Sequence, residues 1–266
     1  MKKSLFITLA TAVFLSPPTA RSQNVTSESG GTAIGGADWS REKPSGPLLK
    51  SAPDDANWTV IFAYPEDAAK KPSSDKIALS PQMAARPRKM VVDKTGATMR
   101  VQTIEVSGRI KDKWYLGDTQ YTLLPGQKLW MESKASSGEF DPSYEQQSAT
   151  GFSDFEWVSD NSYLGRMSFS GRSCLVFVPG GISLLDAAGP NVDAKKIQAM
   201  LAAQPIIALV DSDSRLPYIF RNRGEVQTFV FGPSPSVKLS VPVELAEMIK
   251  RGMEAQARLL APIPRP

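Results

Sequence analysis

Few side chains in this chain could perform chemistry, because its 266 residues contain no histidine and a single cysteine, Cys174. Without histidine, neither a Ser-His-Asp triad nor a Cys-His pair can form, and histidine-based zinc sites are excluded. A single cysteine also excludes thiolate metal clusters. The composition therefore predicts a protein without enzymatic activity and without a cofactor or a catalytic metal.

Two pairs of carboxylates are the remaining candidates for catalysis. Asp154 and Glu156 lie two residues apart in a segment expected to be a strand, FEWV at 155–158, so their side chains would share one side. Asp211 and Asp213 have the same spacing. Paired carboxylates can hydrolyse glycosidic bonds or hold calcium. Acidic residues at strand ends more often face water or cap turns, and a hydrolase is therefore the third hypothesis for this chain.

Cys174 begins the apolar run CLVFV, which has the residues of a strand. A free cysteine behaves as a small hydrophobic residue when it is buried. We therefore predict that Cys174 is an inert core residue, with an intermolecular disulfide as the alternative. A nucleophilic role is disfavoured, because no histidine is present to activate the thiol.

Residues 1–22 have the pattern of a secretory signal peptide. Lys2 and Lys3 precede an apolar run of 11 residues from position 5 to position 15, which is too short to span a bilayer. We predict cleavage between Ser22 and Gln23, with a cut after Ala20 or an uncleaved anchor as alternatives. The mature chain is then secreted, to the periplasm or cell envelope, and no later segment is apolar enough to span the membrane.

The net charge argues against a nucleic-acid partner. The 22 leader residues hold three basic and no acidic side chains, so their removal lowers the formal net charge from +4 to +1. Nucleic-acid binding requires a concentrated basic face. The densest basic cluster, Arg86, Arg88 and Lys89, is expected to lie along one exposed strand.

Composition divides the mature chain into three parts. Residues 23–55 are rich in Gly, Ser and Pro and are predicted to be a flexible arm, with local docking by Trp39 and two leucines. Residues 56–240 are predicted to form a curved antiparallel β domain with one internal helix, at 193–203. Residues 241–266 are predicted to be a C-terminal amphipathic helix and a tail.

The β domain contains about nine or ten short strands separated by tight turns. Consecutive strands with short turns pair in antiparallel fashion. The fold class is therefore mainly β (α+β), a strongly curved antiparallel sheet resembling a half-barrel, with two helices packed against one face. The sheet and the helices each bury the apolar surface of the other.

Aromatic residues on the expected strands are the candidates for ligand binding. Most such residues form a core, but a curved sheet covered by helices can also leave a cavity that they line. The predicted cavity-lining residues are Trp58, Phe62, Trp114, Trp130, Trp157, Phe177 and Phe229.

The late strands resemble those of a known family. An apolar strand ends at residues 209–211 in Leu-Val-Asp, a polar turn follows, Leu-Pro at 216–217 opens the next strand, and its partner ends in Phe-Val-Phe at 229–231. This order is similar to the closing strands of periplasmic half-barrel proteins related to the outer-membrane lipoprotein carrier, over residues 57–232.

The resemblance implies an unclosed barrel whose concave face is plugged by helices and whose apolar cavity binds acyl chains or another lipid-like ligand. The N-terminal arm and the final helix depart from that family. The sequence thus predicts a protein that binds a lipid or a lipoprotein. The alternative is a structural or interaction module whose partners are envelope proteins.

Overall fold

The computed structural model describes residues 38–64, 80–117, 119–123, 126, 129–134, 151–189 and 192–260. The first group of strands is β1 (Asp55–Ala63), β2 (Pro87–Thr95), β3 (Thr98–Glu105), β4 (Ile110–Leu116), β5 (Thr119–Leu123) and β6 (Trp130–Lys134). The second group is β7 (Tyr163–Phe169), β8 (Arg172–Phe177), β9 (Ile206–Asp211), β10 (Pro217–Asn222) and β11 (Glu225–Phe231).

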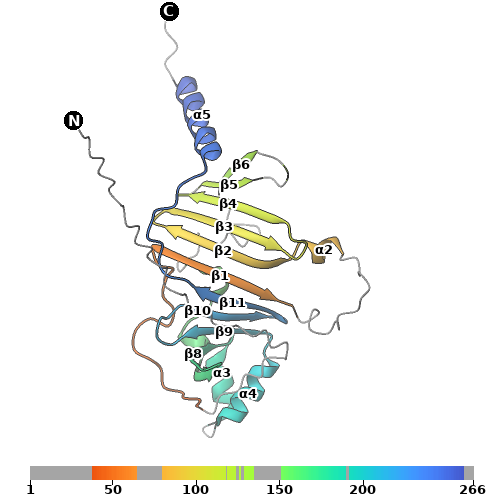
Figure 1. The fold of residues 1–266 in the computed structure, drawn as a ribbon. Coiled ribbons are helices and arrows are strands. Elements are labelled where there is room, and N and C mark those ends of the chain that lie inside the picture. The colour runs from red at the N-terminus through yellow and green to blue at the C-terminus, as the bar shows by residue number, and fades with distance from the viewer. Residues whose placement is uncertain are drawn as a thin grey trace, which may run out of the picture. The chain divides into compact units, whose positions relative to one another are not determined.

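These strands form a single antiparallel sheet of 11 strands in the described part of the chain, in the order β6-β5-β4-β3-β2-β1-β11-β10-β9-β8-β7 (Figure 1). Strands next to each other in the chain pair with each other within each group. The two groups are joined where β1 pairs with β11, with Trp58 opposite Phe231 and Val60 opposite Phe229. The edge strands β6 and β7 do not pair, so the curved sheet stays open, as the predicted fold class requires.

Alternating burial defines the two faces of the sheet. In β1 the side chains of Trp58 and Val60 are buried, whereas that of Ile61 is 44% exposed. We call the face that carries Trp58 and Val60 the inner face, and the opposite one the outer face. Strand β8 is buried on both faces, and this double burial explains its continuous apolar sequence.

Three helices pack on the outer face. Helices α3 (Gly181–Ala188) and α4 (Ala194–Ala203) cover β7 to β10, and Ile197 and Leu201 of α4 are fully buried there (Figure 1). Helix α5 (Val243–Leu260) contacts β4 to β6 through Leu245, which is also fully buried. The predicted packing of helices on one face is therefore confirmed.

The ends of these helices follow from local sequence. Helix α4 starts where the side chain of Asp193 accepts a hydrogen bond of 2.7 Å from the Lys196 N–H. Helix α3 has no counterpart among the elements predicted from the sequence. Its first residue, Gly181, lies so close to the Ser162 carbonyl that a Cβ atom would clash with it. Another short helix, α2 (Pro81–Ala84), is capped by Ser80. Among the described helices, none combines the length and apolar character needed to cross a membrane.

The predicted strand at 155–158 is wrong. Two 3-10 helices occupy this region, η2 (Ser153–Phe155) and η3 (Asp160–Ser162). The side chains of Ser159 and Ser162 each bond to the other residue's backbone N–H, which closes η3. These local hydrogen bonds satisfy the backbone without a neighbouring strand.

Candidate ligand-binding site on the inner face

The inner face carries an apolar cluster that runs from β8 across β11 and β1 to β4. We call it the inner cluster. Its buried members are Leu48, Ala56, Trp58, Val60, Met90, Val92, Met99, Val101, Tyr115, Phe152, Phe155, Tyr163, Leu175, Phe177, Ala208, Val210, Phe220 and Phe229. Cross-strand register brings the members that lie on strands together, because side chains opposite each other on paired strands project from the same face. Leu48, Phe152 and Phe155 come from segments outside the strands.

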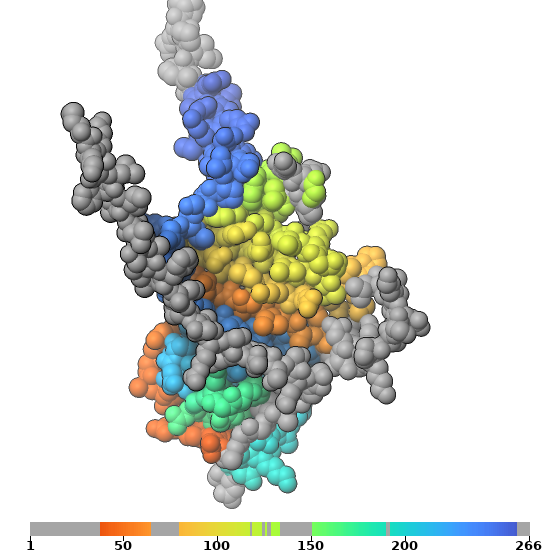
Figure 2. Space-filling model, viewed as in Figure 1, coloured from red at the N-terminus to blue at the C-terminus, as the bar shows by residue number. Residues whose placement is uncertain are grey.

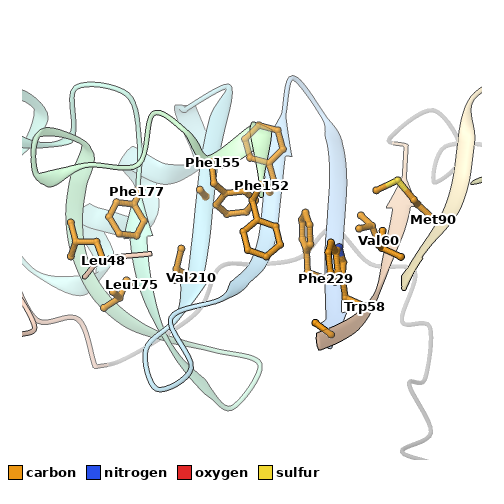
Figure 3. Packing of buried hydrophobic residues seen from close by; sticks show 14 of the residues in the cluster. Leu48, Trp58, Val60, Met90, Phe152, Phe155, Leu175, Phe177, Val210 and Phe229 are labelled. Carbon is orange, nitrogen blue, oxygen red and sulfur yellow. The ribbon is translucent and has the colours of Figure 1, made fainter. Parts of the chain in front are cut away.

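Residues 151–163 lie over the aromatic part of the inner cluster, and we call them the cover segment. Phe152 and Phe155 are each 1% exposed. The ring of Phe152 lies edge-on to that of Phe229, with 6.3 Å between centroids, and Phe155 lies edge-on to Phe229 at 5.5 Å. Figure 3 shows both rings directed at the strands, with Phe152 beside Trp58 and Phe229. The cover segment thus contacts this part of the sheet largely through two phenylalanine side chains.

Internal hydrogen bonds hold the shape of the cover segment. Trp157 Nε1 donates to the Asp154 carbonyl at 2.8 Å, and Ser162 Oγ donates to the carbonyl oxygens of Trp157 and Ser159. Its connection to the sheet backbone lies at one end, where the Val178 N–H donates to the Ser162 carbonyl at 2.9 Å. Hydrogen bonds between neighbouring residues therefore contribute much of the structure of the segment.

Residues 38–54 cover the other end of the inner cluster. Leu48 is buried beside Leu175 and Phe177 (Figure 3). Ser40 forms a backbone bridge with Arg166 of β7, and the Lys50 N–H donates to a carbonyl oxygen in the turn before β10. The inner face is thus covered by irregular chain, and the helices lie on the other side of the sheet.

The cover segment carries one half-buried carboxyl group, that of Asp154. Burial raises the pKa of Asp154, a hydrogen bond from the Gln227 side chain acts against this rise, and the negative charge of Glu225 adds to it. A raised pKa favours the neutral acid, which is compatible with an apolar surrounding.

Five of the seven predicted cavity-lining residues belong to this site. Trp58, Phe177 and Phe229 are buried members of the inner cluster, and Phe62 and Trp157 are partly buried against it. Their roles as ligand contacts remain a prediction, since each of them also packs against protein atoms.

The other two, Trp114 and Trp130, lie on the outer face. Trp114 is opposite Tyr121 on β5, and both pack with Trp130 and with Leu245 of α5. The structure therefore separates the predicted aromatic residues into two groups on opposite sides of the sheet. A strand exposes alternate residues to alternate faces, and Trp114 has the opposite parity to Tyr115, which joins the inner cluster.

Phe152 was not among the predicted residues, although it makes more aromatic ring contacts than any of them. It contacts Trp58, Phe229 and Phe231 at centroid distances of 5.7, 6.3 and 6.0 Å. A signal for it was present in the sequence: Phe152 and Phe155 are three residues apart, the spacing of one helical turn.

The two carboxylate pairs lie at a 3-10 helix and at the end of strand β9. The predicted strand that would align Asp154 with Glu156 is absent, because residues 153–155 form η2. Burial by itself would raise the pKa of Asp211, but hydrogen bonds from Ser214 and from the Asp213 N–H hold it below its usual value. Asp211 thus caps a turn, and no group of three or more possible metal ligands occurs in the described residues.

Cys174 is a core residue, as predicted. It is fully buried in the cluster between the outer face and helices α3 and α4. Burial raises the pKa of its thiol to about 12, and the nearby carboxylate of Asp211 contributes to the rise. The thiol is therefore neutral at physiological pH and poorly nucleophilic.

Comparison with known proteins finds similarity among solved structures. No family model matches the sequence, and no curated protein is similar to it in sequence. Among solved structures, the chain is similar to a LolA superfamily protein from Nitrosomonas europaea, with 12% identity and a TM-score of 0.28, over 71% of this chain and 90% of that one. Because a TM-score of this size says nothing about a shared ligand, what the site can bind follows from this chain's own residues.

Proposed function

We propose that the chain is an exported, non-enzymatic protein that binds an apolar, lipid-like ligand on the inner face of its sheet. One observation carries the proposal: the aromatic side chains of β1, β10 and β11 are covered by irregular chain, largely through Phe152 and Phe155. Apolar contacts are non-directional, so an apolar ligand can replace these two rings. The side-chain hydrogen bond between Gln227 and Asp154 is a polar contact that such a displacement would break. The pattern of a signal peptide in residues 1–22 supports a location in the periplasm or cell envelope.

In this proposal the cover segment acts as a displaceable lid. Its backbone connection to the sheet at Ser162 lies next to the start of β7, and can serve as the fixed end. Movement of Phe152 and Phe155 away from the sheet would uncover the rings of Trp58 and Phe229 for a ligand. Transport or chaperoning of a lipid or of a lipoprotein is the activity that such a site would serve.

Native mass spectrometry of the mature protein, purified from its own host without detergent, tests the proposal. A stoichiometric lipid-like adduct is expected, and organic extraction would identify it. An apo mass that stays unchanged when fatty acids and phospholipids are offered contradicts the proposal.

Quenching of tryptophan fluorescence by a brominated fatty acid locates the site. Trp58 and Trp114 form a matched pair, since they are 1% and 3% exposed and lie on opposite faces. In the Trp114→Phe variant most of the quenching should remain, whereas the Trp58→Phe variant should lose a large share of it. Equal losses in the two variants would place the ligand elsewhere.

A second candidate is an interaction module of the cell envelope, which helix α5 favours. Its first half is docked through Leu245, whereas Met253 and Leu259 in its second half are 67% and 86% exposed. Helix α5 is drawn in blue in Figure 2. Exposed apolar residues on a helix suit a protein partner. Deleting residues 251–266 would abolish partner capture under this alternative, but would leave binding of a fatty acid unchanged under the main proposal.

A further inference from the structure

We propose that Arg166 and Arg215 form a binding site for the anionic group, a carboxylate or a phosphate, of an amphiphilic ligand. The inference rests on the proposed function, because it assigns the apolar part of that ligand to the inner cluster. It also specifies the chemical class of the ligand, an anionic amphiphile, since an uncharged lipid would form no ion pair with the two arginines.

The two arginines lie at the same end of the inner face. Arg166 on β7 is opposite Leu175 on β8, and Leu175 is opposite Val210 on β9. Residues opposite each other project from one face, so Arg166 shares the face of two members of the inner cluster. Arg215 lies in the turn that follows β9, five residues after Val210.

Neither guanidinium is paired with a carboxylate in the described part of the chain. The Nη1 atom of Arg215 is buried, and no acceptor for it exists among the described residues. Arg215 also has a φ of 62°, in the left-handed region that side chains other than glycine rarely adopt. A buried donor without an acceptor and a strained backbone are both unfavourable, and their coincidence at one residue is typical of a binding site.

Tyr163 shows that both arginine charges act at one place. Burial raises the pKa of its hydroxyl, and the charges of Arg166 and Arg215 both act against this rise. The carboxylate of Glu42 adds to the rise, and the Tyr163 hydroxyl donates to the Glu42 carbonyl oxygen at 2.8 Å. Two cations and one anion therefore act on this hydroxyl, which lies in the apolar cluster.

Tyr163 also links this charge to the apolar site. Its ring centroid lies 5.6 Å from that of Phe177, and both rings belong to the inner cluster. An amphiphile whose chain lies among these rings can place its head group at the arginines. The planar guanidinium binds carboxylate and phosphate oxygens through two parallel hydrogen bonds, and this geometry suits either head group.

Three probes with the same twelve-carbon chain test the inference: laurate, dodecyl phosphate and 1-dodecanol. Their affinities are measured by calorimetry for the mature protein and for an Arg166→Gln/Arg215→Gln double variant. Arg223→Gln is the matched control, because Arg223 also has a positive φ, of 48°, and is an exposed arginine in the β10–β11 turn. Thermal unfolding of each variant checks that the fold is retained.

We expect the mature protein and the Arg223→Gln variant to bind at least one of the two anions roughly ten- to a hundredfold more tightly than dodecanol. In the double variant this preference should disappear, while the affinity for dodecanol stays within about twofold. The stronger of the two anions identifies the head group as a carboxylate or a phosphate. If all three probes bind equally, or if the double variant keeps the preference, the anion site is refuted and the proposed function stands. If none of them binds, the proposed function itself fails, and the anion site with it.

Discussion

The contact between Phe152 and the sheet provides a direct test of the displaceable cover. The Phe152→Ala variant removes a ring that is 1% exposed and that contacts Trp58, Phe229 and Phe231. Truncation of a buried phenylalanine to alanine costs about 3–5 kcal/mol, through lost transfer free energy and a residual cavity. Each aromatic pair contributes about 0.5–1.5 kcal/mol beyond the buried area, which is part of this figure.

Removal of the Phe152 ring should also strengthen ligand binding. If the cover segment must leave the sheet before a ligand enters, the apparent affinity scales with the fraction of open molecules. Destabilising the closed state by about 3 kcal/mol raises that fraction by up to roughly a hundredfold, since 1.4 kcal/mol corresponds to a factor of ten. We therefore expect Phe152→Ala to lower the free energy of unfolding and to bind an apolar ligand more tightly.

Two assays separate these effects. Urea unfolding gives the loss of stability, and titration with the uncharged dye N-phenyl-1-naphthylamine gives the affinity. The matched control is Phe169→Ala, because Phe169 is 5% exposed and lies edge-on to Tyr218 at 6.2 Å in the cluster on the outer face. The control should lose a similar free energy of unfolding and keep the wild-type affinity for the dye.

The test depends on a difference in dye affinity between Phe152→Ala and Phe169→Ala. If Phe152→Ala binds the dye no more tightly than the wild-type protein, the cover segment does not compete with the ligand. If both variants bind more dye to the same extent, general loosening of the protein is responsible. Either result refutes a lid formed by residues 151–163.

Three further predictions concern the rest of the domain. Cys174 should react only slowly with a thiol reagent in the native protein, because it is fully buried and its thiol pKa is raised to about 12; fast stoichiometric labelling would show that this cluster opens. In urea unfolding, Leu245→Ala should lower the free energy of unfolding by about 2–5 kcal/mol, because Leu245 is fully buried. Leu259→Ala, at an 86% exposed position of the same helix, should change it by less than about 0.5 kcal/mol. Equal effects would mean that α5 is docked differently. Burial of Glu105 acts to raise its pKa, but its ion pairs, at 2.8 Å to Lys111, hold the pKa below its ordinary value. The resulting stabilisation is present above the unfolded-state pKa and is lost as the pH falls through the folded-state value, so stability should fall more steeply on acidification in the wild-type protein than in Glu105→Gln.

The sequence was sufficient for most of the local structure. The turn between β2 and β3 is in Asp-Lys-Thr-Gly at 93–96, a sequence typical of a hairpin turn, and Gly96 has the positive φ of 57° that the turn requires. The helix predicted at 193–203 appears as α4, whose apolar spacing and capping residue Asp193 lie within a few positions of one another. Turns, caps and periodicity depend on residues within a few positions of one another, so they can be read along the chain.

The composition also excluded histidine-dependent triads, and the sequence around Cys174 predicted that this residue is buried. A chain without histidine cannot form the common nucleophilic triads, whatever its fold. The apolar run around Cys174 predicted burial, because a strand covered on both faces has no polar alternation. The class of the site, apolar and aromatic, follows from the same residue types.

Only the tertiary structure decided which aromatic residues form a site. The pairing of β1 with β11 joins residues about 170 positions apart, and it places Trp58 beside Phe231. The register of β4 then sends Trp114 to the outer face, because a shift of one residue reverses the side of every side chain in a strand. Long-range pairing and register depend on the packing of the whole sheet, so no local pattern could have separated Trp114 from Trp58 or brought Arg166 and Arg215 to one end of the inner cluster.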